Sequence, residues 1–403
     1  MRSRTRSELG LLFEDTWAAR PAVACRAPGR VNIIGEHIDY HGFSVLPMAI
    51  GGDIMVVAAL KPAEGVGGGG GDRAQWSVEA VNTDADRYPP FSWQVCFPAP
   101  GDTIASLRTR QAAGEGAAVL QTEPPWTDYV ACGVLGAWEH VVESGRGSGG
   151  GAHAPLPPSG RLLLAVGGTV APASGLSSSS ALVCASLLAA LAAWGQPVPP
   201  AQVLASRAAD CERYVGTMGG GMDHAASFLS VPGCALLLHF NPLSTTAVTL
   251  PPQATLLVGN SMTRAHKAEE EHPFNVRVIE GKVACILLAV SLGRRVEDSC
   301  VTFAELVTLF ATSRADSASP LATAGTPASQ SGASQDAGPA FVTMDAHVMY
   351  GKVLAYALEI LPQGAVSLDQ VTPRSMRPHV TPEYLLTNAL LSLHTLSGHI
   401  SMR

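Results

Sequence analysis

A run of small and apolar residues from Ala181 to Trp194 is the feature that most restricts how this chain can fold. Its 14 residues are too few to cross a bilayer as a helix, but they suit a helix buried in the core of a globular protein. Four serines at 177–180 directly precede the run and can supply oxygens that cap a helix. We therefore expect a buried helix over 177–194 with serines at its start.

The segment that leads into this helix is rich in glycine. It reads GGTVAPASGLSSSSA over residues 167–181 and follows a predicted strand at Leu162–Val166. A glycine-led turn that enters a helix presents free backbone N–H groups at the positive end of the helix dipole, which suits the phosphates of a nucleotide. A hydroxyl among Ser177–Ser180 could also bind Mg²⁺. An ordinary capped helix after a flexible loop explains the pattern equally well, and the absence of GxxxxGK[ST] excludes a Walker-type loop.

A second polar motif lies near the start of the chain. Residues 26–48 read RAPGRVNIIGEHIDYHGFSVLPM and place Arg30, Glu36, His37 and Asp39 within ten residues. Carboxylates accept hydrogen bonds from the hydroxyls of a sugar, whereas arginine and histidine donate hydrogen bonds to its oxygens. The motif therefore indicates a site for a polyhydroxylated ligand, with a solvated polar loop as the alternative.

A third segment, CERYVGTMGGGMDHAAS over 211–227, carries two acids around a glycine run. Asp223 follows the glycines, and Glu212 lies on the preceding predicted helix. A carboxylate near bound phosphate can orient or deprotonate an attacking hydroxyl, and a second one can hold a metal ion. Each acid taken singly is also typical of a protein surface.

Composition excludes several classes of function. The chain has 403 residues, 47% of them hydrophobic, which is enough for two domains with a sizeable core. Its net charge is −7 with scattered basic residues, so we expect no nucleic-acid partner. Eight cysteines without a CxxC pair, and an N-terminal apolar run too short for a signal peptide, indicate a cytoplasmic protein without a membrane partner. GxSxG and HExxH are absent, which leaves hydrolase and zinc-peptidase functions unsupported.

The remaining pattern predicts mixed α and β structure. Glycine-, proline- or serine-rich stretches predict surface loops or disorder at Gly65–Gly71, Ser144–Gly160 and Ser313–Pro339. Besides Leu162–Val166, strands are expected at Ala22–Cys25, Ile54–Leu60, Ala235–Phe240 and Ala254–Asn260. Besides the helix over 177–194, helices are expected at Ala201–Tyr214, near Asp223 and at Asn275–Leu292.

Together, in this order, the three motifs resemble those of the GHMP kinases. GRVNIIGEHIDYHG is similar to the galactokinase signature, and PASGLSSSSA is similar to the phosphate-binding motif of the whole family. ERYVGTMGGGMD and HPFNVRVIE resemble the eukaryotic galactokinases and N-acetylgalactosamine kinases. The resemblance implies an α+β fold: an N-terminal domain like the second domain of ribosomal protein S5, then a ferredoxin-like domain. It also implies a monomer that uses ATP and Mg²⁺ to phosphorylate the anomeric hydroxyl of galactose or N-acetylgalactosamine.

The resemblance also implies roles for individual residues. Arg30 and Asp223 would form the catalytic pair, and we expect their side chains to approach within roughly 3 to 6 Å. The sugar would be bound by this pair together with Glu36, His37, Asp39, Gly220 and Phe274. The phosphates would be bound by Gly175, Leu176, Ser177, Ser178, Ser179 and Ser180. Mg²⁺ would be held by Ser179 and Glu212, and adenine would lie near Trp126 and Tyr129, which could equally be core aromatics on a helix.

Two departures from the family pattern affect these expectations. Phe274 stands where galactokinases usually carry a sugar-contacting tyrosine, and His41 replaces an asparagine common in bacterial galactokinases. The resemblance therefore leaves open which sugar is the substrate. No segment of the type LTGAGWGGC follows in the sequence.

The missing segment shapes the domains that we expect. These are an N-terminal domain over 1–240, the start of a second domain over 241–312, a disordered linker over 313–340 and a partial helical remainder over 341–403. Such a chain would be a poor kinase, because domain closure completes the site. A protein that binds sugar and ATP without turnover, or an incomplete gene product, are the alternatives.

Overall fold

The computed structural model describes residues 2–61, 75–96, 126–146, 160–215, 217–259, 261, 273–291 and 302–308. Contacts between residues divide the chain into two compact units, Met1–Asn275 and Val276–Arg403. The fold described below belongs to the first unit. Of the second unit, the structure describes the part of α7 (Pro273–Ser291) that follows Asn275, and residues 302–308. The four-part domain division expected from the sequence stays a prediction.

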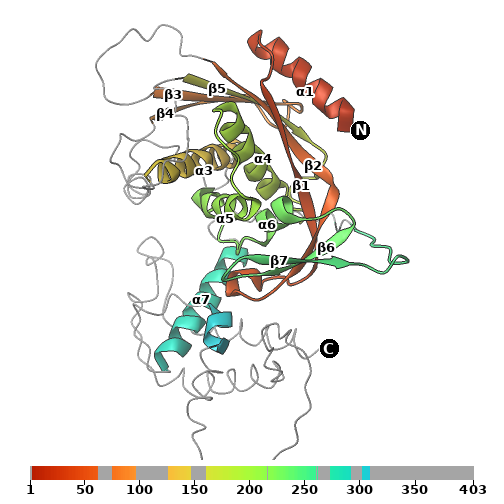
Figure 1. Ribbon diagram of the computed structural model, residues 1–403, viewed down its shortest axis with the longest axis vertical. Coiled ribbons are helices and arrows are strands. Elements are labelled where there is room, and N and C mark those ends of the chain that lie inside the picture. The colour runs from red at the N-terminus through yellow and green to blue at the C-terminus, as the bar shows by residue number, and fades with distance from the viewer. Residues whose placement is uncertain are drawn as a thin grey trace, which may run out of the picture. The chain divides into compact units, whose positions relative to one another are not determined.

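A five-stranded mixed sheet forms the frame of the first unit (Figure 1). Its order is β1 (Val23–Ile34), β2 (Leu46–Lys61), β5 (Gly160–Gly168), β3 (Gln75–Asn82) and β4 (Phe91–Cys96). The β3–β5 pair is parallel, and the other neighbouring pairs are antiparallel. Two further strands, β6 (Cys234–His239) and β7 (Ser244–Thr249), form a separate antiparallel hairpin.

Strand β5 is buried on both of its faces. Leu162 and Leu164 contribute to the main core, whereas Leu163 and Ala165 face a second, smaller core on the other side of the sheet. This follows from the sequence, because alternate residues of a strand point to opposite faces and the stretch LLLAV offers apolar side chains to both.

The main core lies between the sheet and a layer of helices. α4 (Ser178–Ala193) packs on β1 and β2, with α3 (Trp126–Arg146) and α5 (Ala201–Glu212) beside it (Figure 1). Because α4 is apolar on every side, it is stable only when it is surrounded. The close approach of α3 requires glycine, since a Cβ atom on Gly133 would lie 2.6 Å from the carbonyl oxygen of Val183.

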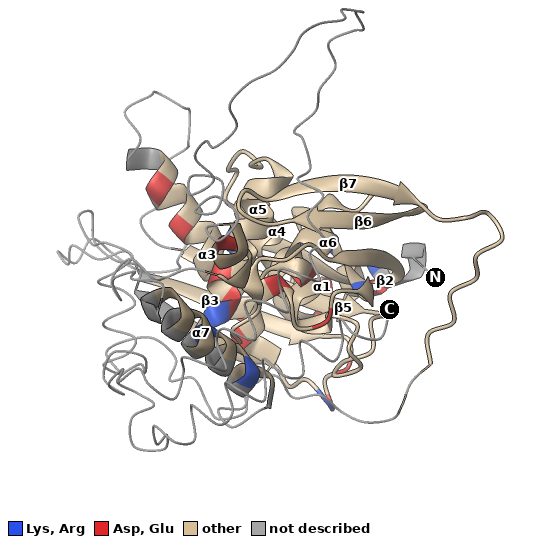
Figure 2. Ribbon diagram, turned by 90° about the horizontal axis from the view of Figure 1, so that it is seen from below, with Lys and Arg blue, Asp and Glu red and all other residues tan. Residues whose placement is uncertain are grey.

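Charged side chains also join α3 to α5. The Arg207 guanidinium of α5 lies 3.2 Å from Glu139, which is buried on α3, and also pairs with Glu143 one turn further on. Acidic positions along α3 are visible in Figure 2, where Lys and Arg are scattered over the described elements. Within the described parts of the chain, no helix is long and apolar enough to cross a membrane.

Helix α1 (Arg2–Trp17), which the sequence analysis did not predict, covers the opposite face of the sheet (Figure 1). Leu9 and Phe13 of this helix are fully buried in the second core. At the end of α1, the Trp17 indole donates to Glu79 on β3 over 3.0 Å, and Glu79 also accepts a 2.8 Å bond from Arg161 on β5. Helix α1 is therefore held on the sheet both by apolar packing and by this hydrogen bond.

The α+β fold class expected from the sequence is confirmed. The predicted strands near 22–25, 54–60, 162–166 and 235–240 lie in β1, β2, β5 and β6, and the predicted helices correspond to α4, α5, α6 (Met222–Leu229) and α7. The strand expected at 254–260 is wrong for residues 254–259, which pair with no strand and expose Leu257 at 96%. β3, β4 and β7 were not predicted.

The expected low-complexity segments lie mostly beyond these elements. α3 extends to Arg146, so the loop expected from Ser144 begins later than predicted. Gly65–Gly71 and the ranges 313–340 and 341–403 fall outside the described residues.

Replacing Phe13 by alanine tests the docking of α1. The ring is fully buried, so its loss leaves a cavity, and we expect the free energy of unfolding to fall by about 3 to 5 kcal/mol. Leu11→Ala on the same helix is the matched control, because this side chain is 62% exposed, and it should change the free energy by less than about 0.5 kcal/mol. Denaturant unfolding of both variants gives the comparison, and equal effects would show that α1 is not docked through Phe13.

Candidate functional site

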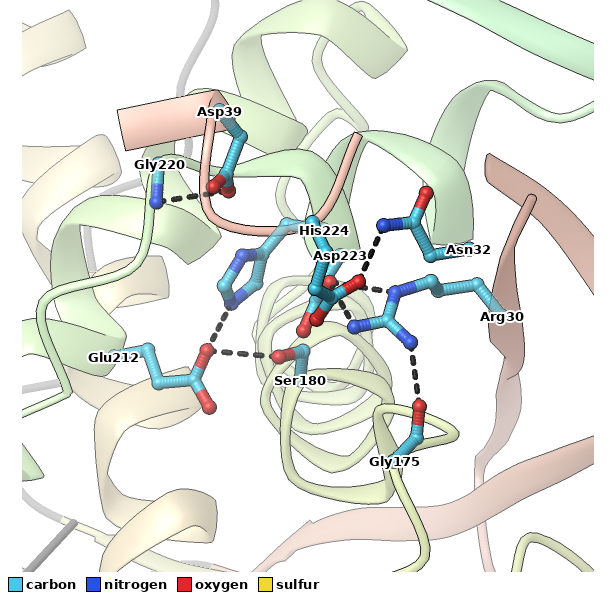
Figure 3. Close-up of polar contacts among 10 residues, drawn as sticks. Arg30, Asn32, Asp39, Gly175, Ser180, Glu212, Gly220, Asp223 and His224 are labelled. Carbon is cyan, nitrogen blue, oxygen red and sulfur yellow. Dashed lines mark hydrogen bonds and ion pairs between the residues drawn. The ribbon is translucent and has the colours of Figure 1, made fainter. Parts of the chain in front are cut away.

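One pocket of the first unit gathers the polar residues of all three motifs. It is lined by residues from the N-terminal motif, the start of α4 and the end of α5. Further lining residues come from the three consecutive glycines over 219–221 (the glycine turn), the start of α6 and Phe274. Its lining residues are Arg30, Glu36, His37, Asp39, Ser179, Ser180, Glu212, Thr217, Gly219, Gly221, Met222, Asp223, His224 and Phe274. Figure 3 shows the polar contacts among the residues at its centre.

The Arg30 side chain is the centre of this network (Figure 3). It extends from β1, is 3% exposed, and approaches Asp223 Oδ1 to 2.7 Å with Nε and to 2.6 Å with Nη2. Its Nη1 donates to the carbonyl oxygen of Gly175 over 2.6 Å. The predicted approach of Arg30 and Asp223 is therefore confirmed, although both distances are shorter than the lower end of the predicted range. The same guanidinium also holds the turn before α4.

Arg30 keeps its charge in spite of burial. Burial alone would lower the pKa of the guanidinium, but the charge and hydrogen bond of Asp223 and the charges of Glu36 and Asp39 outweigh it and raise the pKa. A buried cation is stable only with such partners. The pocket thus holds one permanent positive charge among several carboxylates.

Asp39 and Gly220 connect the N-terminal motif to the glycine turn. Asp39 begins a short 3-10 helix, η1 (Asp39–His41), and its Oδ2 accepts the Gly220 N–H over 3.1 Å. A Cβ atom on Gly220 would lie 2.3 Å from the backbone nitrogen of Tyr40, so only glycine fits here. The glycine run therefore serves a close backbone contact, and it brings the start of α6 beside the motif.

An acidic and aromatic wall completes this side of the pocket. The Asn32 amide donates to Glu36 Oε2 over 2.5 Å, and His37 Nδ1 lies 2.9 Å from the Tyr40 hydroxyl. The Phe274 ring lies 5.4 Å from the His37 ring and 5.8 Å from the Tyr40 ring. Carboxylates beside an apolar ring face suit a sugar, which has hydroxyls on its rim and C–H groups on its faces.

The start of α4 lies at the same pocket. Ser178 is the first helical residue, as expected within one residue, and Ser179 and Ser180 line the pocket. The side-chain cap expected from the serines is wrong for Ser177, which has a left-handed backbone (φ 57°) and makes no side-chain capping bond. Because the first N–H groups of a helix have no partner within it, they can bind an anion.

A buried pair, Glu212 and His224, lies beneath this helix end (Figure 3). Glu212 Oε2 accepts the Ser180 hydroxyl over 2.8 Å and lies 2.7 Å from His224 Nε2. Burial favours the protonated carboxyl, but His224 and the Ser180 hydrogen bond outweigh burial, so the pKa of Glu212 is lowered. Glu212 is therefore a carboxylate although it is 4% exposed.

The residues present fit a magnesium ion of a nucleotide. Among the described residues, no group of three or more His, Cys, Asp and Glu could hold a metal by itself. Mg²⁺ usually needs only one or two protein oxygens beside phosphate and water, and the Ser179 hydroxyl and the ionised Glu212 both line the pocket. Its four lining carboxylates against one arginine would also repel a triphosphate that lacked a cation.

Trp126 and Tyr129 do not line this pocket as described. Both lie on α3. The Trp126 indole donates to the carbonyl oxygen of Pro89 over 3.3 Å and packs edge-on against Tyr88. Tyr129 is partly buried against the main core. The proposed contact of these two residues with adenine stays a prediction.

Sequence reasoning missed His224, Asn32 and Thr217. His224 and Thr217 line the pocket, and Asn32 holds Glu36. His224 directly follows the predicted Asp223, but its partner Glu212 lies on another helix. No spacing in the sequence reveals such a pair, because the two helices meet only through the tertiary fold.

Comparisons with known proteins agree with the geometry. The family profile described as "Galactokinase galactose-binding signature" matches residues 11–60, and that described as "GHMP kinases N terminal domain" matches residues 134–230. A galactokinase of Schizosaccharomyces pombe is 34% identical over 69% of this chain and 49% of its own length. A galactokinase of Candida maltosa is 30% identical over 53% of this chain and 80% of its own length.

The identity to a solved structure and the share of each relative that is covered give the extent of the similarity. A solved galactokinase of Lactococcus lactis in complex with galactose is 18% identical, with a TM-score of 0.48, over 71% of this chain and 62% of that one. Against the first curated relatives, the chain spans about half of their length, 49% and 47% for the proteins of S. pombe and Dictyostelium discoideum.

Gly220→Ala tests the contact between the N-terminal motif and the glycine turn. The new methyl group would clash with the backbone of Asp39 and Tyr40, so we expect the free energy of unfolding to fall by about 1 to 3 kcal/mol. Gly219→Ala is the matched control, since a Cβ atom there has no neighbour within 4 Å and should cost less than about 0.5 kcal/mol. Thermal unfolding of the two variants, if it gave the same melting temperature, would contradict the close approach.

Proposed function

This chain belongs to the galactokinase family, and we propose that it transfers the terminal phosphoryl group of ATP to the anomeric hydroxyl of galactose. The observation that carries the proposal is the Arg30–Asp223 pair: Arg30 belongs to the N-terminal motif, and its guanidinium contacts both Asp223 and the Gly175 carbonyl before α4. Phosphoryl transfer depends mostly on position and charge compensation. A carboxylate for the acceptor hydroxyl and a cation beside it are what such a reaction needs.

The sugar end of the proposed site consists of Glu36, His37, Asp39 and the backbone at Gly220. The carboxylates would accept hydrogen bonds from the sugar hydroxyls, and His37 is positioned by the Tyr40 hydroxyl 2.9 Å away. Phe274 would pack against the sugar ring or a substituent on it. This apolar ring makes N-acetylgalactosamine the second substrate to test.

The phosphate end of the proposed site is the segment Gly175–Ser180. The described pocket lining supplies one arginine and no lysine, and we propose that backbone N–H groups, Arg30 and a metal ion balance the negative charge of the phosphates. Arg30 fixes this segment by two hydrogen bonds. Its side chain donates to the carbonyl oxygen of Gly175, and its backbone N–H donates to the carbonyl oxygen of Leu176. The phosphates would therefore be placed relative to the same guanidinium that holds Asp223.

Asp223 suits an orienting role better than that of a strong base. Both of its bonds from Arg30 end on Oδ1, which reduces the ability of that oxygen to accept a proton. A loose transition state requires little deprotonation of the acceptor before transfer. We therefore assign Asp223 to orienting the anomeric hydroxyl, and Arg30 to stabilising the charge that develops beside it.

Mg²⁺ would be held by Ser179 and Glu212. When bound, it would neutralise charge on the phosphate oxygens. Trp126 and Tyr129 on α3 are the proposed neighbours of adenine. A monomeric, cytoplasmic protein is part of the same proposal.

The assay for the proposal is sugar-dependent release of ADP by the full chain, with ³¹P NMR to identify an anomeric sugar phosphate. We expect product with galactose and none after Mg²⁺ is removed by a chelator. Asp223→Asn keeps the shape of the side chain but removes its charge, and should lower turnover by about 10³-fold while changing ATP affinity by less than about threefold.

The matched control is Asp86→Asn, because Asp86 is an exposed acid outside the pocket. It should retain the turnover of the unaltered chain. Turnover of Asp223→Asn equal to that of the control would exclude Asp223 from the reaction. Absence of any sugar phosphate with galactose and N-acetylgalactosamine would contradict the proposed function itself.

A further inference from the structure

His224 is a buried polar residue that the proposed reaction does not use. It follows Asp223 in α6 and is 4% exposed, yet it lines the same pocket. Its Nε2 is directed at Glu212 and lies 2.7 Å from Oε2 (Figure 3). A lone pair facing a carboxylate at that distance would be repelled, so Nε2 must carry a hydrogen.

Glu212 Oε2, on α5, is contacted by residues of two other helices, α4 and α6. It belongs to the last residue of α5, it accepts the hydroxyl of Ser180 in the first turn of α4, and it contacts His224 in the first turn of α6. The two contacts come from different directions and end on one oxygen (Figure 3). A carboxylate with two such partners cannot rotate about the Cγ–Cδ bond without losing one of them.

We propose that His224 is a positioning residue that fixes the Glu212 carboxylate so that its other oxygen, Oε1, is available to the Mg²⁺ of Mg-ATP. The inference rests on the proposed function. Partners of a metal ligand that do not touch the metal set the orientation of the ligand, and their loss typically weakens metal binding by about 10- to 100-fold. His224 thereby links the helix that carries Asp223 to the metal end of the site.

A purely structural role for His224 makes a different prediction. If the imidazole only neutralised a buried acid, replacing it would lower stability and leave the metal affinity of the folded protein unchanged. Metal affinity, measured without turnover, therefore separates the two roles.

Two amide substitutions provide a matched pair. In His224→Gln the amide nitrogen can occupy the place of Nε2 and still donate to Glu212. In His224→Asn it can reach only the place of Nδ1, whereas the 2.7 Å contact with Glu212 is made by Nε2. The variants thus differ mainly in whether Glu212 keeps its second donor.

The experiment measures binding of Mn²⁺ to the full chain by electron paramagnetic resonance, in the presence of the non-hydrolysable analogue AMP-PNP. We expect His224→Gln to bind Mn²⁺ within about threefold of the unaltered chain, and His224→Asn to bind it about 10- to 100-fold more weakly. Galactose affinity, measured by calorimetry on the same samples, should be unchanged in both variants.

Equal Mn²⁺ affinity in both variants would overturn the inference, as would weakened galactose binding in step with Mn²⁺ binding, which indicates a collapsed site. Absence of Mn²⁺ binding by the unaltered chain would overturn it too. If His224→Asn does not fold, His224→Leu, which keeps bulk but cannot donate, takes its place: a loss of Mn²⁺ affinity of about 10-fold or more supports the inference, and retained affinity contradicts it. Failure of the proposed function is recognised separately, as a chain that binds Mn²⁺ and AMP-PNP but forms no sugar phosphate.

Discussion

The buried guanidinium of Arg30 is the constraint on which the rest of the site depends. A cation removed from water is costly unless every side of it is satisfied. Here one group donates to Asp223 on α6 and to the Gly175 carbonyl before α4, from a position on β1. Three segments distant in sequence must therefore come together before the charge is compensated, and they are the segments that carry the three sequence motifs.

The helix layer gives this network a fixed base. α4 is surrounded by apolar neighbours, so its first turn is held in place at the pocket rather than on a free surface. Glu212 then ties that turn to α6 through Ser180 and His224. The proposed phosphoryl transfer would require such a rigid helix layer and polar network, because its catalysis consists largely of holding charges at set distances.

The secondary structure that the sequence predicted correctly has a local cause, whereas the long-range contact of Arg30 with Asp223 was expected from the family resemblance. The apolar run predicted α4 to within one residue at each end. The misses have causes outside the local sequence. The apolar stretch near Leu257 has no paired strand among the described residues, and α1 is stable only because a second sheet face is available to bury Phe13. Ser177 adopts a left-handed backbone, which rules out the usual side-chain cap.

Arg30→Lys tests the central claim most directly, because it keeps the positive charge and removes the planar fork that joins three segments. The measured quantity is the rate of galactose-dependent ADP release by the full chain, with circular dichroism to confirm that the variant is folded. We predict a loss of at least about 100-fold, since a single ammonium cannot reproduce the bonds to both Asp223 and the Gly175 carbonyl. A folded variant within about threefold of the unaltered rate would show that charge alone suffices and would contradict the account.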